Sequence, residues 1–476
     1  MNVYQLAEDA AHKWKDNPAI QDEQGTLSFG EMYSEISLLR QNLVDSGIRK
    51  GMGIGVMARN SRNFIIALLA GVGCDAVIMP ISHQLKKAEI DEIIDNSGLH
   101  GIIDDLSGVN PLTSKQQIIE TPNGNLRFGW TGRNVAEHIT PHVPNAAFIR
   151  FTSGTTGKSK GVIVSHQSTI ERIEAANKAL LLGPRDTVVW VLPMAYHFLV
   201  SIILYIRFGA AIAICKDFLA SSIINITNRF NGTLLYASPM HIRLLASDKT
   251  DVQMPSLKRV ISTSTAISME HCIAFKNRFH IDVSQAYGII EIGLPIINFK
   301  KSDEHPNAVG NALPDYRVEL LDENYEVLPP ESIGKLAIQG PGMFDAYLSP
   351  SQSRAEILKN GWFLTGDLAS KTVDGLITIC GREKSMINVS GNKVFPEEVE
   401  DVLISHPAII TCKVSGTTHA LMGEIVQAKI VLKQGTQITT EVILDYCRQK
   451  LSTYKVPQSI EFVDQLEMTG SGKVKR

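Results

Sequence analysis

The sequence predicts an α/β fold: a large N-terminal domain of αβ layers with a β-rich subdomain, followed by a small α+β domain. Three observations predict it. Apolar and helical segments alternate over residues 53–81, short alternating strands fill residues 308–380, and the pattern changes again after Gly381. We therefore expect an N-terminal domain over residues 1–381 and a C-terminal domain over residues 382–476.

The earliest clear elements form a strand–helix–strand unit. An apolar run at residues 53–58 is followed by helical spacing at 61–72 and a second apolar run at 76–81. Such a unit implies that its two strands are parallel, because the helix carries the chain back to the same end of the sheet. The same strand–helix–strand pattern is predicted at residues 187–215 and 233–283.

Residues 187–206 (TVVWVLPMAYHFLVSIILYI) carry no charge and have the length of a membrane span. Pro193 and His197 near the middle, and the β-branched opening, favour a buried strand that leads into a buried helix. We expect no membrane span here.

The later elements are shorter and of two kinds. The segments RVELLD, GKLAIQG and DGLITICG are separated by Gly, Pro and Asp, which is typical of a β-rich layer. A helix is then predicted from Pro396, followed by the strands IITCKVSG and EIVQAKIVLK and a helix over residues 440–451. This order predicts a small α+β domain.

Composition indicates a folded protein without an electrostatic preference for polyanions. Of 476 residues, 44% are hydrophobic and 20% charged, and 46 Lys+Arg against 49 Asp+Glu give a net charge of −3. No basic stripe is present, so we expect no nucleic acid as partner. The six cysteines form no C-x-x-C pair, and residues 1–16 have no signal-peptide core, so we expect a reducing, cytoplasmic location.

The strongest local signal is the segment FTSGTTGKSKG at residues 151–161. Its small and hydroxylated residues predict a loop whose backbone N–H groups and hydroxyls converge on phosphate oxygens. A solvated turn is the alternative if the loop is considered alone. A Walker A loop requires a glycine at Thr152 and a helix directly afterwards, whereas β-branched residues follow Gly161. The context therefore excludes a P-loop.

Four further motifs accompany this loop in a fixed order. They are QAYGIIE (285–291), GWFLTGDLA (361–369), GREKSMINVSGNKVFPEEVE (381–400) and TGSGKVKR (469–476). Together the five motifs resemble those of the adenylate-forming superfamily, which includes acyl-CoA and aryl-CoA synthetases and peptide-synthetase adenylation domains. The resemblance extends over nearly the whole chain and implies the fold of these enzymes, with a mobile C-terminal domain.

The resemblance implies a two-step reaction. A carboxylate attacks the α-phosphate of ATP to give acyl-AMP and pyrophosphate, and a thiol then displaces AMP to form a thioester. Because an anion attacks phosphorus surrounded by negative oxygens, catalysis is mostly positioning and charge neutralisation. The implied cofactors and substrates are ATP, Mg²⁺, a small-molecule carboxylate, and CoA or the phosphopantetheine of an acyl carrier protein.

The resemblance also assigns site residues. Glu291 would help hold Mg²⁺ on the phosphates, Tyr287 would stack on adenine, and Asp367 would accept both ribose hydroxyls. Taken without the motif, Glu291 is an ordinary surface carboxylate. The residues expected to bind ATP or AMP are Thr152, Ser153, Gly154, Thr155, Thr156, Gly157, Lys158, Ser264, Thr265, Ala266, Tyr287, Gly288, Asp367 and Arg382.

Lys473 is the expected catalytic lysine of the C-terminal motif. It would bridge the carboxylate and the α-phosphate, and then leave for the second step. The resemblance implies that the C-terminal domain rotates about Lys384, which brings a thiol channel near Ser390 and Gly391 into the site. A solvated linker charge is the alternative interpretation of Lys384.

Three positions depart from the family pattern. The family threonine of the QxYGxTE motif is Ile290, which removes a hydroxyl expected at the α-phosphate. The stretch before adenine is STSTAIS (262–268), bulkier than the usual glycine-rich one, and a family proline is Ser159. These changes keep a non-catalytic nucleotide-binding homologue as a third alternative to a ligase and to a carrier-protein loader.

The segment LPMAYHFLVS (192–201) corresponds to the family's substrate wall. It carries no acid that could hold an α-ammonium group, so we expect an acid other than an α-amino acid. Tyr196 and His197 match the aromatic and histidine side chains common in acyl and aryl ligases. A histidine packed in the core beside Trp190 is the alternative for His197. Fatty, aryl and short branched acids all remain open.

Overall fold

The computed structural model describes residues 2–110, 115–133, 135–136, 138–152, 160–390, 392–419, 423–467 and 474. The chain forms two compact units. The first comprises Met1–Arg317 and Gln339–Gly361, and the second comprises Val318–Ile338 and Trp362–Arg476. The predicted domain boundary between residues 381 and 382 stays a prediction.

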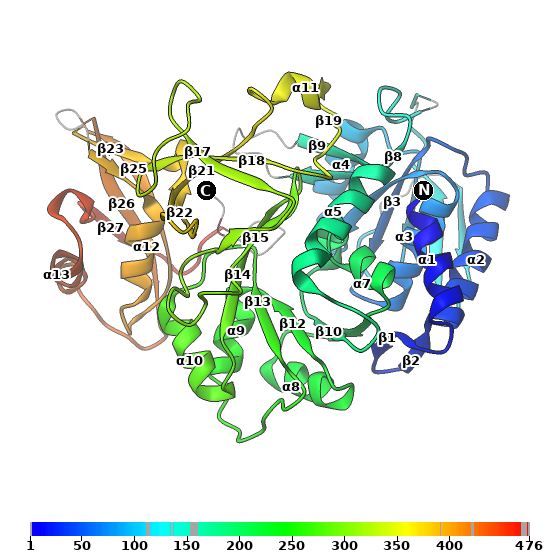
Figure 1. Ribbon diagram of the computed structural model, residues 1–476, viewed down its shortest axis with the longest axis horizontal. Coiled ribbons are helices and arrows are strands. Elements are labelled where there is room, and N and C mark those ends of the chain that lie inside the picture. The colour runs from blue at the N-terminus through cyan, green and yellow to red at the C-terminus, as the bar shows by residue number, and fades with distance from the viewer. Residues whose placement is uncertain are drawn as a thin grey trace. The chain divides into compact units, whose positions relative to one another are not determined.

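The first unit contains two large sheets (Figure 1). The first sheet has the strand order β16-β15-β14-β13-β12-β10-β11-β1-β2. Its strands are β1 (Pro18–Asp22), β2 (Gly25–Ser28), β10 (Thr187–Trp190), β11 (Ala211–Ile214), β12 (Leu234–Ala237), β13 (Arg259–Ser262), β14 (Val283–Ile289), β15 (Gly293–Ile297) and β16 (Asn311–Ala312). Strands β10, β12, β13 and β14 are parallel, so their carboxyl ends lie along one edge, where ligands bind in open α/β sheets.

The second sheet has the order β20-β19-β9-β8-β4-β3-β5-β7-β6. Its strands are β3 (Gly53–Ala58), β4 (Val77–Ser82), β5 (Gly101–Asp104), β6 (Gln116–Ile119), β7 (Leu126–Trp130), β8 (Ala146–Thr152), β9 (Lys160–Ser165), β19 (Ala346–Tyr347) and β20 (Gln352–Ser353). Strands β3 and β4 are parallel, as the strand–helix–strand pattern predicts. Strands β8 and β9 are antiparallel, which confirms that the predicted phosphate loop joins two strands.

Helices accompany both sheets in the first unit (Figure 1). They are α1 (Val3–Lys13), α2 (Phe29–Asp45), α3 (Arg62–Gly73), α4 (Lys87–Ser97), α5 (His166–Leu180), α6 (Met194–His197), α7 (Ile202–Phe208), α8 (Ala220–Arg229), α9 (Pro239–Ala246), α10 (Met269–Phe279) and α11 (Arg354–Ile357). The α3 helix begins after Ser61, whose hydroxyl accepts the N–H of Phe64 at 3.3 Å, a side-chain cap that fixes where the helix starts.

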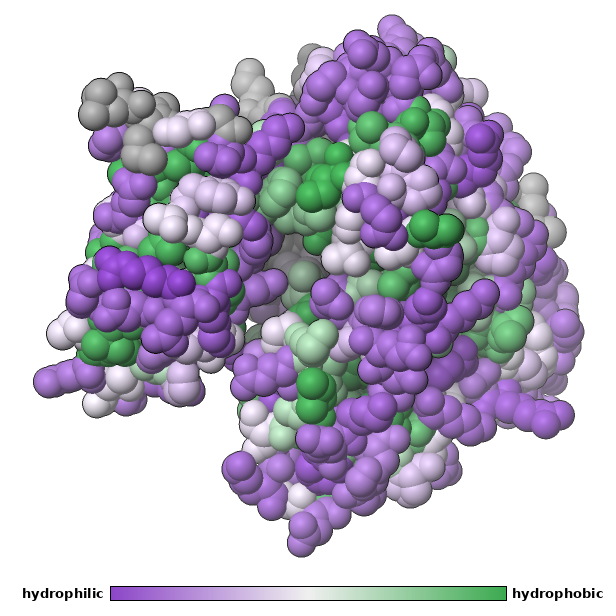
Figure 2. All heavy atoms as spheres, turned by 60° about the vertical axis from the view of Figure 1, so that its left-hand side comes forward, coloured by the Kyte–Doolittle hydropathy of each residue, from purple (hydrophilic) through white to green (hydrophobic). Residues whose placement is uncertain are grey.

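The uncharged run of residues 187–206 folds as the sequence predicts. It forms β10, the short helix α6 and the start of α7, and Trp190 and Tyr205 within it are buried. Across the described part of the chain, every helix is too short or too polar to traverse a bilayer. On the face in Figure 2, hydrophilic residues cover most of the surface and hydrophobic ones are scattered among them.

The second unit begins with an antiparallel sheet in the order β17-β18-β21-β22. Its strands are β17 (Arg317–Leu321), β18 (Ile333–Gln339), β21 (Phe363–Lys371) and β22 (Ile377–Arg382). They confirm the strands predicted at RVELLD, GKLAIQG and DGLITICG, whereas β16, β19 and β20 from the same predicted range of 308–380 pair into the sheets of the first unit. A 3-10 turn, η1 (Glu383–Ser385), follows β22.

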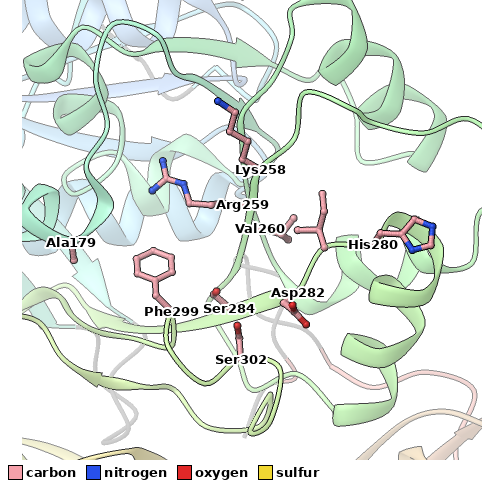
Figure 3. A pocket seen from close by; sticks show the side chains of 10 residues that line it. Ala179, Lys258, Arg259, Val260, His280, Asp282, Ser284, Phe299 and Ser302 are labelled. Carbon is pink, nitrogen blue, oxygen red and sulfur yellow. The ribbon is translucent and has the colours of Figure 1, made fainter.

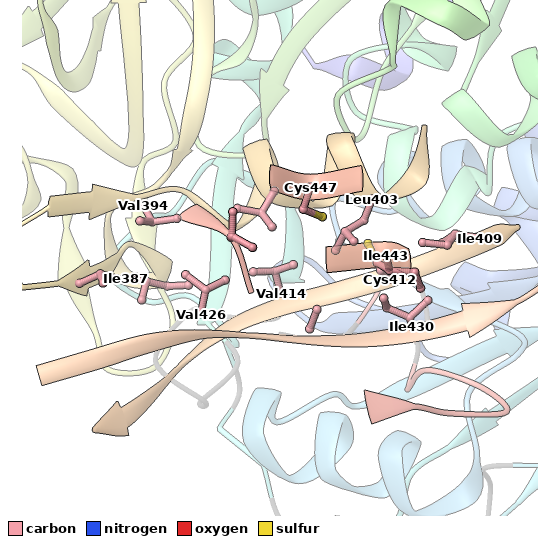
Figure 4. Close-up of a cluster of buried hydrophobic side chains, with 14 residues drawn as sticks. Ile387, Val394, Leu403, Ile409, Cys412, Val414, Val426, Ile430, Ile443 and Cys447 are labelled. Atoms are coloured by element: carbon pink, nitrogen blue, oxygen red, sulfur yellow. The ribbon is translucent and has the colours of Figure 1, made fainter. Parts of the chain in front are cut away.

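A smaller α+β layer completes the second unit. Its elements are β23 (Ile387–Val389), β24 (Asn392–Val394), α12 (Pro396–Ile404), β25 (Ile409–His419), β26 (Gly423–Leu432), α13 (Thr440–Lys450), η2 (Thr453–Lys455) and β27 (Ser459–Phe462). Figure 4 shows its core, in which Leu403 of α12 and Ile443 of α13 meet Val414 of β25. The elements follow the predicted order, because each helix has an apolar face that only this sheet buries.

Candidate functional site

The base of the predicted phosphate loop lies at the carboxyl end of β8. The last pair of the ladder joins Thr152 to Lys160. The loop residues Ser153, Gly154, Thr155, Thr156, Gly157 and Lys158 lie outside the described residues, as does the side chain of Thr152. Lys160, at the start of β9, places its ammonium group 4.6 Å from the centre of the Tyr347 ring.

Glu291 lies in the turn between β14 and β15, close to this base. The Tyr347 hydroxyl donates a hydrogen bond to Oε1 of Glu291 at 3.1 Å. Tyr347 belongs to β19, which pairs with β9, so one tyrosine contacts both the acid and Lys160. Burial, and then Glu291 itself, raise the pKa of Tyr347, which keeps its hydroxyl a donor. Tyr347 therefore links Glu291 to Lys160, at the base of the predicted phosphate loop.

A buried arginine fixes the backbone of the same turn. Arg172 of α5 donates from Nη1 to the carbonyl of Ile290 at 2.9 Å. Its Nε and Nη2 donate to the carbonyl of Gly342 at 2.9 and 2.6 Å. The carbonyl of Glu291 accepts the N–H of Phe344 at 2.7 Å. We name this set of contacts around Arg172, Glu291 and Tyr347 the Glu291 junction.

The expected adenine-lining residues follow β13 and lie in β14, two adjacent parallel strands. Buried Gln285 joins them: its Oε1 accepts the N–H of Ile267 at 3.1 Å, and its Nε2 donates to the carbonyl of Pro306 at 2.7 Å. The chain reverses at Ser264, whose φ of +82° lies in the left-handed region. Thr265 and Ala266, next in this loop, are exposed.

Tyr287 and Gly288 lie where β14 departs from regular pairing with β15. A Cβ atom on Gly288 would come within 2.7 Å of the carbonyl oxygen of Gly293, so this irregular pairing requires glycine. Tyr287 is half-buried and Gly288 is exposed. Both residues thus lie on the strand next to the one that leads into the loop of Ser264, and their contact with adenine stays a prediction.

The predicted substrate wall is held at its start by a side chain from the other sheet. Asn60, just after β3, donates to the carbonyl of Leu192 and accepts the N–H of Met194, both at 2.8 Å. Tyr196 and His197 of α6 are half-buried. The His197 ring lies 6.3 Å from the ring of buried Trp190, so it borders the core without being enclosed by it.

Arg150 of β8 contacts the same wall. Its Nη1 donates to the carbonyl of Tyr196, and its guanidinium carbon lies 5.1 Å from the centre of the Tyr196 ring. The Tyr196 hydroxyl also bonds the side chain of Ser82 at the end of β4. Burial raises the pKa of Tyr196, so its hydroxyl stays protonated. We extend the term substrate wall from residues 192–201 to the set of side chains gathered here, Asn60, Arg150, Trp190, Tyr196 and His197.

In the second unit, Asp367 and Arg382 are opposite each other on β21 and β22. Arg382 Nε donates to Oδ1 of Asp367 at 2.7 Å, and Asp367 is only 4% exposed. Gly366, with φ of +77°, turns the strand so that the N–H of Asp367 reaches Oγ1 of Thr365 at 3.1 Å. The two residues expected at the ribose are therefore neighbours.

The predicted hinge and thiol-channel residues are in part described. Lys384 is exposed in η1, next to Glu383, which pairs with Lys335 at 3.0 Å. Ser390 is exposed at the tip of the β23–β24 hairpin with φ of +50°. Gly391 and Lys473 lie outside the described residues. Their roles stay predictions.

A separate pocket of about 550 Å³ opens at the other edge of the first sheet (Figure 3). Lys258 and Arg259 line it from the start of β13, and His280, Asp282 and Ser284 line it from the start of β14. It lies at the amino ends of strands whose carboxyl ends carry the adenine-lining residues. The candidate site residues that the structure describes do not line it.

Sequence reasoning missed Arg150, Arg172, Tyr347 and Asn60. Arg150 left a signal, since it is the charged residue of the otherwise apolar strand AAFIRFT. Arg172 is fully buried on α5. A charged residue among the polar positions of a helix is usually exposed, so its sequence context did not mark it. Tyr347 and Asn60 follow no pattern, because their partners are distant in sequence.

The chain is similar to known proteins over nearly its whole length. The chain matches the AMP-binding enzyme family over residues 7–348 and the AMP-binding enzyme C-terminal domain over residues 398–473. It is 25% identical to a sulfoacetate–CoA ligase of Cupriavidus necator, covering 98% of this chain and 95% of that protein. It is 25% identical to a long-chain-fatty-acid–CoA ligase of Escherichia coli O6:H1, covering 100% and 93%.

Among solved structures, ATP-bound MatB of Rhodopseudomonas palustris superposes with a TM-score of 0.84 at 24% identity, covering 100% of this chain and 97% of that one. This likeness confirms the predicted fold class. The matches to named CoA ligases confirm the predicted enzyme class, an AMP-forming ligase of the acyl-CoA synthetase type. The chain belongs to the AMP-binding enzyme family.

Proposed function

We propose that this protein is an ATP-dependent acid–thiol ligase that converts a carboxylic acid to its CoA thioester. The observation that carries the proposal is the Glu291 junction, where a carboxylate held by Tyr347 stands at the base of the phosphate loop. The family match supports the use of ATP and CoA. The absence of an acidic residue from residues 192–201 supports an acid without an α-ammonium group.

In the first half-reaction, a carboxylate oxygen attacks the α-phosphorus, and the bond to the β-phosphate oxygen breaks to release pyrophosphate. Glu291 fits a Mg²⁺ site, because Mg²⁺ is usually bound through one or two carboxylates together with substrate phosphates. Bound there, Mg²⁺ would neutralise developing charge on the phosphates. Asp367 would hold the ribose hydroxyls, Arg382 would orient Asp367, and Lys473 would bridge the carboxylate and the α-phosphate.

In the second half-reaction, the thiolate of CoA attacks the acyl carbon, and the bond to the AMP oxygen breaks. We propose that the domain of residues 382–476 rotates about Lys384 between the two steps. The rotation removes Lys473 and presents the channel beside Ser390 and Gly391 to the thiol. One site then stabilises two transition states in turn.

The acid is not identified by the relatives, since one acts on sulfoacetate and another on long-chain fatty acids. Ile290 removes the family hydroxyl expected at the α-phosphate, which is the observation that favours a nucleotide-binding homologue without catalysis as the alternative. Loading of a carrier-protein phosphopantetheine is the alternative second step.

The test is pyrophosphate release from ATP and Mg²⁺ with a panel of aryl, short-chain, fatty and doubly charged acids. Hydroxylamine serves as acceptor first, and CoA or a phosphopantetheinylated carrier protein replaces it next. Acid-dependent release that rises with CoA supports the proposal, and a rise only with carrier protein supports the alternative. ATP binding without release for every acid would refute catalysis.

The roles of the two half-reactions are separated by Lys473→Ala. We expect this variant to lose adenylation and to keep thioester formation from supplied acyl-AMP. Equal loss of both half-reactions would contradict the assignment of Lys473. Lys475→Ala, two residues away, is the matched control and should keep both activities.

A further inference from the structure

Arg150 is a cation inside the substrate wall whose hydrogen bonding is incomplete. It lies on β8, where alternate side chains share a face, so Arg150 and Phe148 point the same way. Phe148 contacts Phe198 with ring centres 6.4 Å apart, and Arg150 contacts Tyr196. This face of β8 is therefore covered by the segment that the motifs assign to the acid.

The protein satisfies only part of the Arg150 guanidinium. One nitrogen, Nη1, donates to the carbonyl of Tyr196. Nε is fully buried and has no hydrogen-bond partner among the described residues, and no ion pair joins Arg150 to an acid of that part of the chain. Burial lowers the pKa of Arg150 to about 10, while Tyr196 and Glu291 act in the opposite direction. Arg150 is half-buried, and its guanidinium keeps a buried donor that the described chain does not use.

A guanidinium with a buried, unbonded donor is costly, since buried polar and charged groups need hydrogen bonds or pairing to offset desolvation. Arg172, in contrast, satisfies its guanidinium within the protein, because Nε, Nη1 and Nη2 each donate to a backbone carbonyl. Arg150 instead retains donors in a fork that matches carboxylate or sulfonate geometry.

We propose that Arg150 recognises a second anionic group on the acid, so that the substrate is a short dicarboxylate or sulfonated carboxylate. The inference rests on the proposed function, because one carboxylate must reach ATP while the other group reaches Arg150. It names Arg150 as a specificity-determining residue that binds substrate and takes no part in bond making.

The aromatic end of the wall limits the length of the acid. Trp190 stacks on Tyr236 with ring centres 5.9 Å apart and planes 8° from parallel, and both rings are buried. A long acyl chain would have to displace them from the core. Trp190 Nε1 is also buried without a partner among the described residues, so the wall holds a second unused donor next to His197. A short, doubly charged acid suits both features.

The experiment compares pyrophosphate release with butyrate, monomethyl succinate, succinate and 3-sulfopropionate. All carry one reacting carboxylate, and the last two add an anion at a similar distance. We expect kcat/KM to be at least about tenfold higher for a dianion than for butyrate, the size of one charge-assisted hydrogen bond. Preference for succinate over 3-sulfopropionate, or the reverse, identifies which anion is recognised.

Two variants locate the preference. Arg150→Gln should raise KM for the preferred dianion at least about tenfold, leave kcat within a few-fold, and leave butyrate nearly unchanged. Arg150→Lys should recover part of the loss, because it keeps the charge. Arg40→Gln is the matched control: Arg40 also donates to one backbone carbonyl, of Gly73, and lies 5.6 Å from a tyrosine ring.

The outcomes separate the two proposals. Release with aryl or fatty monocarboxylates at equal or higher kcat/KM than with either dianion refutes the role of Arg150 and leaves the ligase proposal standing. An equal loss of kcat with every acid in Arg150→Gln refutes it as well, since that is the effect of a structural residue. No release with any acid refutes the ligase proposal, and this inference with it.

Discussion

The Glu291 junction and the substrate wall each contain an arginine, and the two arginines are bonded differently. In both regions burial lowers the arginine pKa to about 10. Arg172 directs three hydrogen bonds to two carbonyls and holds the turn of Glu291 rigid. Arg150 makes one bond and keeps a buried Nε without a partner among the described residues. Arg172 is bonded through all three of its nitrogens within the protein, whereas we propose that a ligand completes the bonding of Arg150.

The largest loss of activity is expected from substitution of Glu291, the carboxylate of the Glu291 junction. Glu291→Gln should lower kcat for pyrophosphate release about 10²- to 10³-fold, as loss of one preorganised electrostatic contact does. The fold should persist, because the amide oxygen still accepts from Tyr347. Steady-state kinetics and thermal unfolding measure the two effects. Glu174→Gln, on exposed α5 surface beside Arg207, should change neither, and an active Glu291→Gln enzyme would refute the role of Glu291.

The two arginines should also differ in what they contribute to stability. Arg172→Met leaves the carbonyls of Gly342 and Ile290 without their donor, so the free energy of unfolding should fall by about 3 kcal/mol. Arg150→Met loses one such bond but also removes an incompletely bonded guanidinium, so the free energy of unfolding should fall by at most about 1 kcal/mol. Urea unfolding of both variants makes the comparison. Equal decreases in the free energy of unfolding would show that both arginines have a structural role and would contradict the contrast between them.

The pH dependence of stability tests how the α5 helix that carries Arg172 is held. His166, at its first position, accepts the N–H of Val3 at Nδ1, 3.2 Å away, and burial lowers its pKa from 6.5 to about 4. The neutral ring therefore stabilises the fold above the unfolded pKa, and this stability is lost as the pH falls through the folded pKa. Between about pH 7 and pH 4.5 the loss from His166 should be about 2 kcal/mol.

Urea unfolding at several pH values measures this loss in the wild type and in His166→Asn. The variant should have a shallower dependence on pH. Some dependence should remain, because burial also lowers the pKa of His241 to about 4. Superimposable profiles for the two proteins would contradict the assignment.

The smallest effect is expected at the tyrosine of the junction. Tyr347→Phe removes the hydroxyl that donates to Glu291 while the ring and its contact with Lys160 remain. We expect kcat to fall up to about tenfold with KM for the acid unchanged, the size of one hydrogen bond. Kinetics at saturating ATP measure it. A larger loss in KM than in kcat would place Tyr347 in the substrate wall instead.

Local patterns determined much of this protein. The apolar run of β3, the capped start of α3 and the order of elements after Gly381 follow from side-chain periodicity and capping, which act over a few residues. The five motifs were enough to predict Glu291, Asp367 and the loop after β8. The residues within each motif are close together in the chain, so their pattern can be found in the sequence without knowledge of the fold.

Only the tertiary structure decided which distant residues meet. Tyr347 joins Glu291 across 56 positions, Arg172 reaches Gly342 across 170, and Asn60 holds the wall from 132 positions away. Such contacts depend on which strands become neighbours, so no local pattern encodes them. The incomplete bonding of Arg150 is likewise a result of packing. The sequence shows a charged residue in an apolar strand, and only the fold shows that its Nε has no hydrogen-bond partner among the described residues.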